Sequence, residues 1–202
     1  VAAVAALFGR HGGTTDVVFS TTLSGRNRAE VEGLIGMFSG IGRIRTDLSG
    51  DPPFSEIVGR THERVVGLFD NQDIPFMRVR QALLPDFPTG GPALAAALPI
   101  ELQYFHTAPE GWAPGVAVVE RPRSGRRDEE LFSRGQLHPL STTLLDDGTE
   151  MWGEVSYKLD FYDDETVEQL AESFERVLDA VGREPWLRLS ELPVNSRRPA
   201  RG

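Results

Sequence analysis

The sequence predicts an α/β fold in which a mixed sheet is covered by helices. Segments with helical apolar spacing alternate with short segments rich in β-branched residues, and the two kinds are interleaved along all 202 residues. Hydrophobic residues make up 40% of the chain. That is enough to bury the core of one domain or one large lobe.

The bulk composition narrows the classes of partner and site. A net charge of -9 argues against a nucleic-acid partner, because phosphate binding needs clustered Lys and Arg. The absence of cysteine excludes disulfides, a thiolate nucleophile and a zinc-thiolate site. The apolar opening run is too short to span a bilayer. We therefore expect a cytoplasmic protein with no membrane segment.

The first 40 residues predict a helix, a strand and a second helix. Residues 1–8 are expected to be the end of a helix that begins outside this chain and stops at Gly9 or Gly12-Gly13. Residues 16–23 are rich in β-branched residues and predict a buried strand. Asn27 is expected to cap a helix whose apolar positions fall over residues 31–38.

The next segment predicts an extended stretch followed by two helices. Residues 41–45 look extended. Asp51-Pro52-Pro53 then starts a strong helix, and Pro75 fits the first turn of another. Residues 85–99 predict a loop with some local helix. The apolar face of the strong helix is expected to comprise Ile57, Val58, Thr61, Val65, Leu68 and Phe69.

The second half predicts a hairpin and a long closing helix. Strands are expected at 100–104 and 116–119, with a solvated loop over 120–136. Residues 137–145 and 150–161 then form a hairpin around Asp146-Asp147-Gly148.

Asp163 is expected to cap a long amphipathic helix that Gly182 ends. From Pro185 the chain predicts a linker with one docking segment, residues 186–189, before a disordered basic end. We therefore divide the chain into residues 1–185 and a linker or tail, 186–202.

Most catalytic patterns are absent from the sequence. There is no Gly-x-Ser-x-Gly elbow, and the glycines at 40 and 42 lack the third glycine of a dinucleotide loop. The four histidines are scattered, so a metal site is not expected. His62 and His138 are each interpreted as an ordinary surface or hydrogen-bonded histidine.

Four ordered segments carry a family resemblance. Residues 17–28 contain a strand that ends in Ser24-Gly25-Arg26, and residues 35–45 resemble a Gly-x-Phe-Val-Asn-Thr-x-x-x-Arg motif. Residues 71–76, Asn-Gln-Asp-Ile-Pro-Phe, and the closing strand through 157–162 complete the set. Together they resemble the carboxy-terminal lobe of a nonribosomal peptide synthetase condensation domain, which has a chloramphenicol acetyltransferase-like fold.

The resemblance implies a division of labour between two lobes. In that family, two lobes enclose a tunnel, and the His-His-x-x-x-Asp-Gly motif lies on the amino-terminal lobe. No catalytic residue is therefore expected in this chain, which should be inactive alone. The implied partners are the amino-terminal lobe, peptidyl carrier proteins and an adenylation domain after the tail. No cofactor is expected to bind directly, because the substrates ride on the phosphopantetheine of carrier proteins.

The resemblance also implies roles for individual residues. Ser39, Gly40 and Ile41 replace the family's Val-Asn-Thr and are expected to line the tunnel, although Gly40 offers no side-chain amide. The residues expected to serve the scaffold are Arg45 through an ion pair, Asp73 as a helix cap, and Gln72, Pro75 and Phe76.

Two other functions remain open at this point. One is an inactive condensation-like domain that recruits a tailoring oxygenase, which the departure at Ser39-Gly40-Ile41 and an Arg-rich stretch at 121–127 would suit. The other is a carrier- or CoA-dependent acyltransferase outside peptide synthesis.

Overall fold

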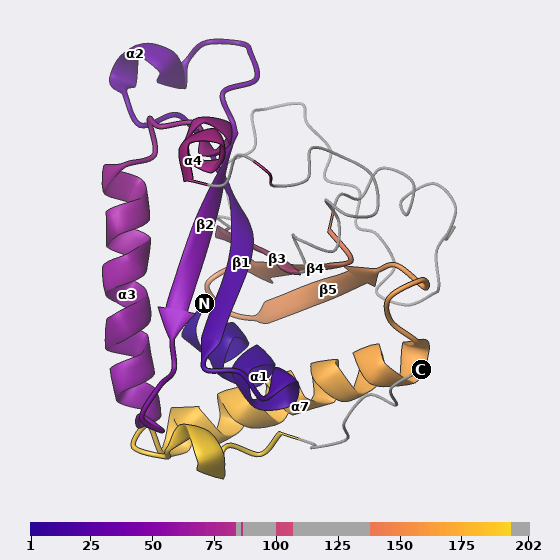
Figure 1. The fold of residues 1–202 in the computed structure, drawn as a ribbon. Helices are drawn as coiled ribbons and strands as arrows, with labels where there is room; N and C mark the ends of the chain where they lie inside the picture. The colour runs from indigo at the N-terminus through magenta and orange to yellow at the C-terminus, as the bar shows by residue number, and fades with distance from the viewer. Residues whose placement is uncertain (84–85, 87–99, 107–137, 195–202) are drawn as a thin grey trace.

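The fold is a mixed sheet with helices, seen in a computed structural model that describes residues 1–83, 86, 100–106 and 138–194 (Figure 1). Expectations for the rest of 85–99, for the strand at 116–119, for the loop at 120–136 and for the last eight residues lie outside the described part. The described strands are β1 (Asp16–Leu23), β2 (Gly40–Asp47), β3 (Ile100–His106), β4 (Leu140–Asp146) and β5 (Met151–Tyr157). The described helices are α1 (Ala2–Gly12), α2 (Ala29–Glu32), α3 (Phe54–Asp70), α4 (Phe76–Leu83) and α7 (Asp164–Arg183), with a short 3-10 turn, η1 (Leu189–Glu191).

The five strands run in the order β2-β1-β3-β4-β5. The two outer pairs, β1 with β2 and β4 with β5, are antiparallel, whereas β1 with β3 and β3 with β4 are parallel. The predicted mixed sheet is therefore confirmed. A parallel neighbour needs a long crossover, and the segment between β1 and β3 contains β2, α3 and α4.

One face of the sheet carries the core. Because side chains alternate along a strand, every second residue points to the same face. Ile44, Phe19, Ile100 and Leu140 follow one another across four strands, and all are buried. Helices α1, α3 and α7 cover this face, which we call the helix face (Figure 1).

Helix α1 is buried on almost every side. Its residues Ala3 to Leu7 are all buried, between α3, α7 and strand β1. Small alanine side chains let the neighbouring helices approach closely, which explains why the segment is apolar throughout rather than amphipathic. It ends as predicted at a glycine, Gly13, which adopts φ 62° and caps the helix in the left-handed conformation.

Helix α3 follows the prediction with two exceptions. It begins after Pro53, and Ile57 and Thr61 are buried against the sheet. Val58 and Phe69, which the spacing placed on the apolar face, are instead exposed. The buried stripe of α3 is narrower than expected, since the helix packs over the edge strand β2.

The helix predicted over residues 31–38 is wrong. Helix α2 covers only one turn, Ala29–Glu32, and the chain beyond it is a loop. Asn27 does not cap it: its side-chain amide donates to Asp73 Oδ1 at 3.0 Å. A residue 46 positions away has thus replaced the local capping partner.

The closing elements agree with the sequence except at their ends. Asp163 caps α7 by accepting a hydrogen bond from the Thr166 backbone at 2.7 Å. The helix continues through Gly182 to Arg183, so the predicted stop at that glycine is wrong. Strand β5 likewise ends at Tyr157, and a turn replaces the predicted extension to residue 161.

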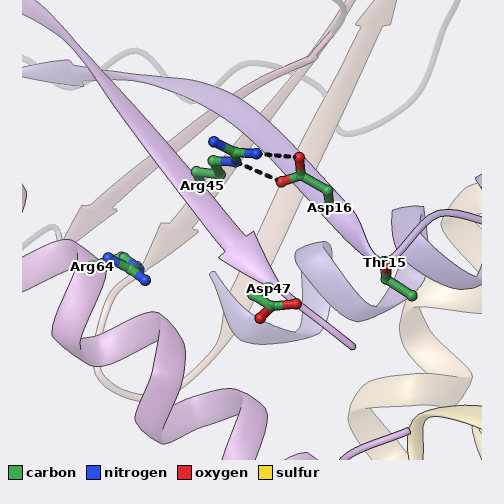
Figure 2. A pocket seen from close by; sticks show the side chains of 5 residues that line it. All are labelled: Thr15, Asp16, Arg45, Asp47 and Arg64. Carbon is green, nitrogen blue, oxygen red and sulfur yellow. Dashed lines mark hydrogen bonds and ion pairs between the residues drawn. The ribbon is translucent and has the colours of Figure 1, made fainter. Parts of the chain in front are cut away.

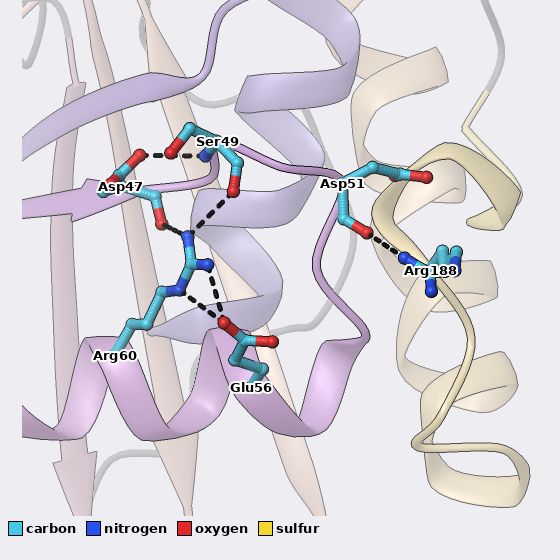
Figure 3. A network of polar contacts seen from close by, with 6 residues as sticks. All are labelled: Asp47, Ser49, Asp51, Glu56, Arg60 and Arg188. Atoms are coloured by element: carbon cyan, nitrogen blue, oxygen red, sulfur yellow. Dashed lines mark hydrogen bonds and ion pairs between the residues drawn. The ribbon is translucent and has the colours of Figure 1, made fainter.

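The segment after Pro185 packs against the rest of the fold, and the packing extends beyond residue 189. Leu189 and Leu192 are buried with the helix-face core. Arg188 pairs with Pro53 in an isolated bridge, and its guanidinium donates to the Asp51 carbonyl at 2.9 Å (Figure 3).

A second arginine organises the turn between β2 and α3. The Arg60 guanidinium donates to the carbonyls of Asp47 and Ser49 at 2.9 and 3.1 Å, and it also pairs with Glu56 (Figure 3). These contacts hold the start of α3 against the end of β2. Within the described residues, no helix is long and apolar enough to cross a membrane.

Candidate functional site

A row of polar side chains crosses the face of the sheet opposite the helix face, which we call the second face. Pairing places Arg43, Ser20, Glu101, Ser141 and Ser156 next to one another on the five strands. The first four each lie one residue along their strand from a member of the apolar row. The two rows show why this sheet has one face for the core and another that can meet polar groups.

Arg43 is the cation of this polar row. Its guanidinium donates to the Ser20 hydroxyl and lies over the ring of Phe76, 4.5 Å from the ring centre. Burial lowers the pKa of Arg43 to about 10, and the negative charge of Glu101 opposes that shift. No carboxylate in the described part of the chain lies within ion-pair distance of this guanidinium. Arg43 therefore keeps N–H donors for a partner on the second face.

Glu101 is the carboxylate of the polar row. It accepts a hydrogen bond from the Ser141 hydroxyl at 2.9 Å, and its side chain is 18% exposed. His138 places Nε2 3.9 Å from Glu101 Oε1 and is itself buried. His138 lies just before β4 and is buried, so its interpretation as a surface histidine is wrong.

The three positions expected to line a tunnel lie at the beginning of β2. Ser39 is exposed just before the strand, and Gly40 pairs with Leu23 at its first position. Ile41 is 45% exposed and points to the second face, two residues from Arg43. The structure therefore brings Ile41 onto the face that carries the polar row.

Arg45 forms an ion pair within this chain. Its Nε and Nη2 donate to the two carboxylate oxygens of Asp16 at 2.8 and 2.7 Å (Figure 2). The pair lines a hollow with Thr15, Asp47 and Arg64 (Figure 2). The bidentate contact lowers the pKa of Asp16, and it occupies both oxygens of that carboxylate. The positive charge of Arg45 therefore largely neutralises the Asp16 carboxylate in this hollow.

The motif at residues 71–76 forms the turn between α3 and α4. Gln72 donates its side-chain amide to the Phe69 carbonyl at 2.9 Å. Both Asp73 oxygens accept hydrogen bonds from Asn27 and Arg28, at 3.0 and 3.1 Å, in place of the predicted helix cap.

The last two motif residues lead into α4. Pro75 precedes the helix, and its carbonyl accepts from Arg78 at 2.8 Å. Phe76 is the half-buried ring on which Arg43 lies. Of the eight residues singled out from sequence, Ile41, Arg45 and Phe76 belong to the second face or contact it.

The sequence alone does not reveal the polar row. Polar and apolar residues alternate over residues 100–103, which marks Glu101, but Ser20 and Ser141 stand in the polar runs 20–22 and 141–143, which show no period of two. The register that joins these positions into one row comes only from strand pairing.

The row can bind polar groups along an extended molecule. It presents the Arg43 guanidinium, the Glu101 carboxylate and the hydroxyls of the half-buried Ser141 and Ser156, all of which form hydrogen bonds with amides. Ser20 is fully buried and is not presented. Among the described residues, no cluster of three or more His, Asp or Glu side chains is arranged to hold a metal ion.

Comparison with known proteins decides the family. A model of the condensation domain matches residues 1–200. The chain belongs to the condensation-domain family. It is 31% identical to a linear gramicidin synthase of Brevibacillus parabrevis over 188 residues, which are 92% of this chain and 3% of that protein. It is also 31% identical to the phosphinothricin tripeptide synthetase PhsB of Streptomyces viridochromogenes, over 96% of this chain and 15% of that protein.

Solved condensation-type structures share the fold. The X-domain from teicoplanin biosynthesis superposes with a TM-score of 0.73 and 29% identity, covering 96% of this chain and 43% of that one. The X-domain in complex with OxyB gives a TM-score of 0.71 and 28% identity, over 97% and 42% of the two chains. The first condensation domain of the CDA synthetase, at 18% identity and TM-score 0.68, shows the fold alone.

This condensation-family chain is therefore a nonribosomal peptide synthetase condensation sequence with a chloramphenicol acetyltransferase-like fold. It spans less than half the length of the solved condensation-type chains it matches.

Proposed function

We propose that this chain is the carboxy-terminal lobe of a condensation domain and that its second face forms one wall of the tunnel. There, aminoacyl or peptidyl thioesters on carrier-protein phosphopantetheine would be joined by amide formation. The proposal rests on how much of the family's domain this chain matches. The family model matches residues 1–200, while the chain spans 42–43% of solved X-domains.

The second face supports the role of a wall. A tunnel for a peptidyl thioester needs groups that satisfy amides, and the polar row offers a guanidinium, a carboxylate and hydroxyls at neighbouring positions. Ile41 lies on the same face beside Arg43. The proton-handling group for amine attack is then expected on the amino-terminal lobe, which also completes the tunnel.

Reconstitution tests this proposal. The carboxy-terminal lobe and the amino-terminal lobe of the same synthetase are purified separately and mixed with two aminoacyl-loaded carrier proteins. We expect a dipeptidyl thioester from the mixture and none from either lobe alone, detected by mass spectrometry of the carrier proteins. Product from the carboxy-terminal lobe alone would refute the assignment of catalysis to the other lobe.

The alternative is an inactive condensation-like domain that recruits a tailoring oxygenase. One observation favours it: the chain is 28–29% identical to X-domains, one of them solved in complex with OxyB. The Gly40 position, with no side chain where the resemblance implies an amide, points the same way.

The same reconstitution separates the two functions. If the mixed lobes give no product, Gly40→Asn restores the amide, and the Cβ it adds meets no atom within 4 Å. Product formation by that variant would identify the departure at residue 40 as the cause of inactivity. Tight binding of an oxygenase to the mixed lobes, with no product from either variant, would favour recruitment.

A further inference from the structure

The loop between α2 and β2 displays large apolar side chains to water. Ile35 is 104% exposed and Met37 is 93% exposed, and Leu34 beside them is 52% exposed. Single exposed apolar residues are common on protein surfaces, but three within four consecutive positions form a patch. We call Leu34, Ile35 and Met37 the apolar loop patch.

Arg26 holds this loop in one shape. Its Nη1 donates to the carbonyls of Val31 and Glu32, the second at 3.2 Å, and its Nη2 donates to the Gly36 carbonyl at 3.2 Å. The guanidinium also lies over the ring of Phe38, 4.6 Å from its centre. One side chain therefore binds the backbone before the patch and at Gly36 within it, and also contacts the Phe38 ring after it. The apolar loop patch therefore lies on a loop whose conformation is held by hydrogen bonds.

The turn before Arg26 makes this arrangement possible. Gly25 adopts φ 65°, and a Cβ at this position would lie 1.8 Å from the Phe38 carbonyl oxygen. Only glycine permits this approach. On the other side, Asn27 and Arg28 bind the Asp73 carboxylate and tie the loop to the α3–α4 turn.

We propose that the apolar loop patch docks on the amino-terminal lobe of the condensation domain. This inference rests on the proposed function, since it names the contact through which the two lobes join. Ile35 and Met37 would insert into an apolar hollow of that lobe, and Arg26 would keep them positioned for docking.

Two observations favour this occupant. The chain spans 42–43% of solved X-domains, so in those relatives more than half of the domain lies outside the matched part and is available to cover the patch. The loop also runs directly into Ser39, Gly40 and Ile41, the positions expected at the tunnel between the lobes. Exposed apolar patches mark protein–protein interaction sites, and the rest of the same domain is a neighbour that is always present.

A matched pair of double variants tests the proposal. Ile35→Ser with Met37→Ser removes the patch. Val58→Ser with Val66→Ser removes two apolar side chains of 45% and 43% exposure from the outer side of α3. The affinity for the separately purified amino-terminal lobe of the same synthetase is measured by calorimetry, and the urea midpoint of each variant confirms that it is folded.

We expect the patch variant to bind the amino-terminal lobe at least about tenfold more weakly than wild type, with an unchanged urea midpoint. The α3 control should stay within about twofold of wild type. Equal binding by wild type and the patch variant overturns the inference and leaves the proposed function standing. No binding by wild type overturns the proposed function itself.

Sedimentation and an oxygenase-binding assay cover the other occupants. If the patch variant loses self-association, or loses oxygenase binding, while its affinity for the amino-terminal lobe is unchanged, the occupant is a second copy or the oxygenase, and the inference is wrong.

Discussion

Asp51 and Ser190 stand 139 positions apart in the chain, and two hydrogen bonds join them. The Asp51 carboxylate accepts from the Ser190 backbone N–H at 2.7 Å and from its hydroxyl at 2.8 Å. Asp51 adopts φ 50°, which turns its carbonyl toward the Arg188 guanidinium (Figure 3). The segment at residues 188–190 is thereby fastened to the turn that precedes α3.

Replacing Asp51 should loosen this segment without unfolding the rest of the protein. Asp51→Gly keeps the left-handed backbone but removes the carboxylate, whereas Asp51→Asn retains an acceptor oxygen and tolerates the same conformation. We expect faster amide hydrogen exchange over residues 188–192 in Asp51→Gly, and exchange near that of wild type in Asp51→Asn. Unchanged exchange in Asp51→Gly would mean that the burial of Leu189 and Leu192 alone holds the segment.

The loss of stability at acid pH should be determined by the protonation of aspartates whose pKa is lowered in the folded protein. Hydrogen bonds to their carboxylates are the leading cause that lowers the pKa of six of them below the ordinary value of 3.8. A depressed folded-state pKa stabilises the fold above the unfolded-state value, and this stabilisation is lost as the pH falls through the folded-state value. The aspartate contribution to the urea midpoint should thus be constant from pH 7 to pH 5 and decline below about pH 4. The six residues are Asp16, Asp47, Asp51, Asp73, Asp146 and Asp163.

Asp163→Asn provides the control for that titration. Asparagine caps a helix about as well as aspartate, so the urea midpoint at pH 7 should change little. Because the amide cannot be protonated in this range, the variant should lose less stability than wild type on acidification. Parallel curves for the two proteins would show that the cap at Thr166 does not contribute to the acid response.

Gly25 and Gly40 should respond in opposite ways to alanine. Alanine at Gly25 must adopt a positive φ, and its Cβ would meet the Phe38 carbonyl. We expect Gly25→Ala to lower the free energy of unfolding by about 1–3 kcal/mol. Gly40 has no positive φ and nothing within 4 Å of a Cβ, so Gly40→Ala should be tolerated. Urea denaturation measures both, and similar losses would contradict the role given to the turn at Gly25.

Two predicted helix caps also show which contacts can be predicted from the sequence. The cap at Asp163 was predictable because its partner, Thr166, lies one helical turn away. Asn27 offered an equally good local signal, but its amide binds Asp73, which no local pattern reveals. Local propensity decides structure where both partners are close in sequence, and tertiary contacts override it elsewhere.

The same reasoning explains why the polar row was not predicted. Polar residues occur in each strand, yet Ser20 and Glu101 are neighbours only because β1 and β3 pair in parallel. The crossover between them is long, so neither the strand order nor the register can be read from the intervening residues. The family motifs predicted the family, the fold and three residues associated with the second face, whereas the polar row that crosses this face required the paired sheet.

Thr46 offers a test of the core itself. Its side chain is fully buried on the helix face of β2, opposite Val17, and its hydroxyl has no hydrogen-bond partner among the described residues. A buried hydroxyl without a partner lowers stability, and valine has nearly the same shape without the polar atom. We expect Thr46→Val to raise the free energy of unfolding by about 1 kcal/mol in urea denaturation. Thr22→Val, at an exposed position of β1, is the control and should change it by less than about 0.5 kcal/mol. A loss of stability in Thr46→Val would show that the hydroxyl is hydrogen-bonded in solution, with an internal water as the natural partner.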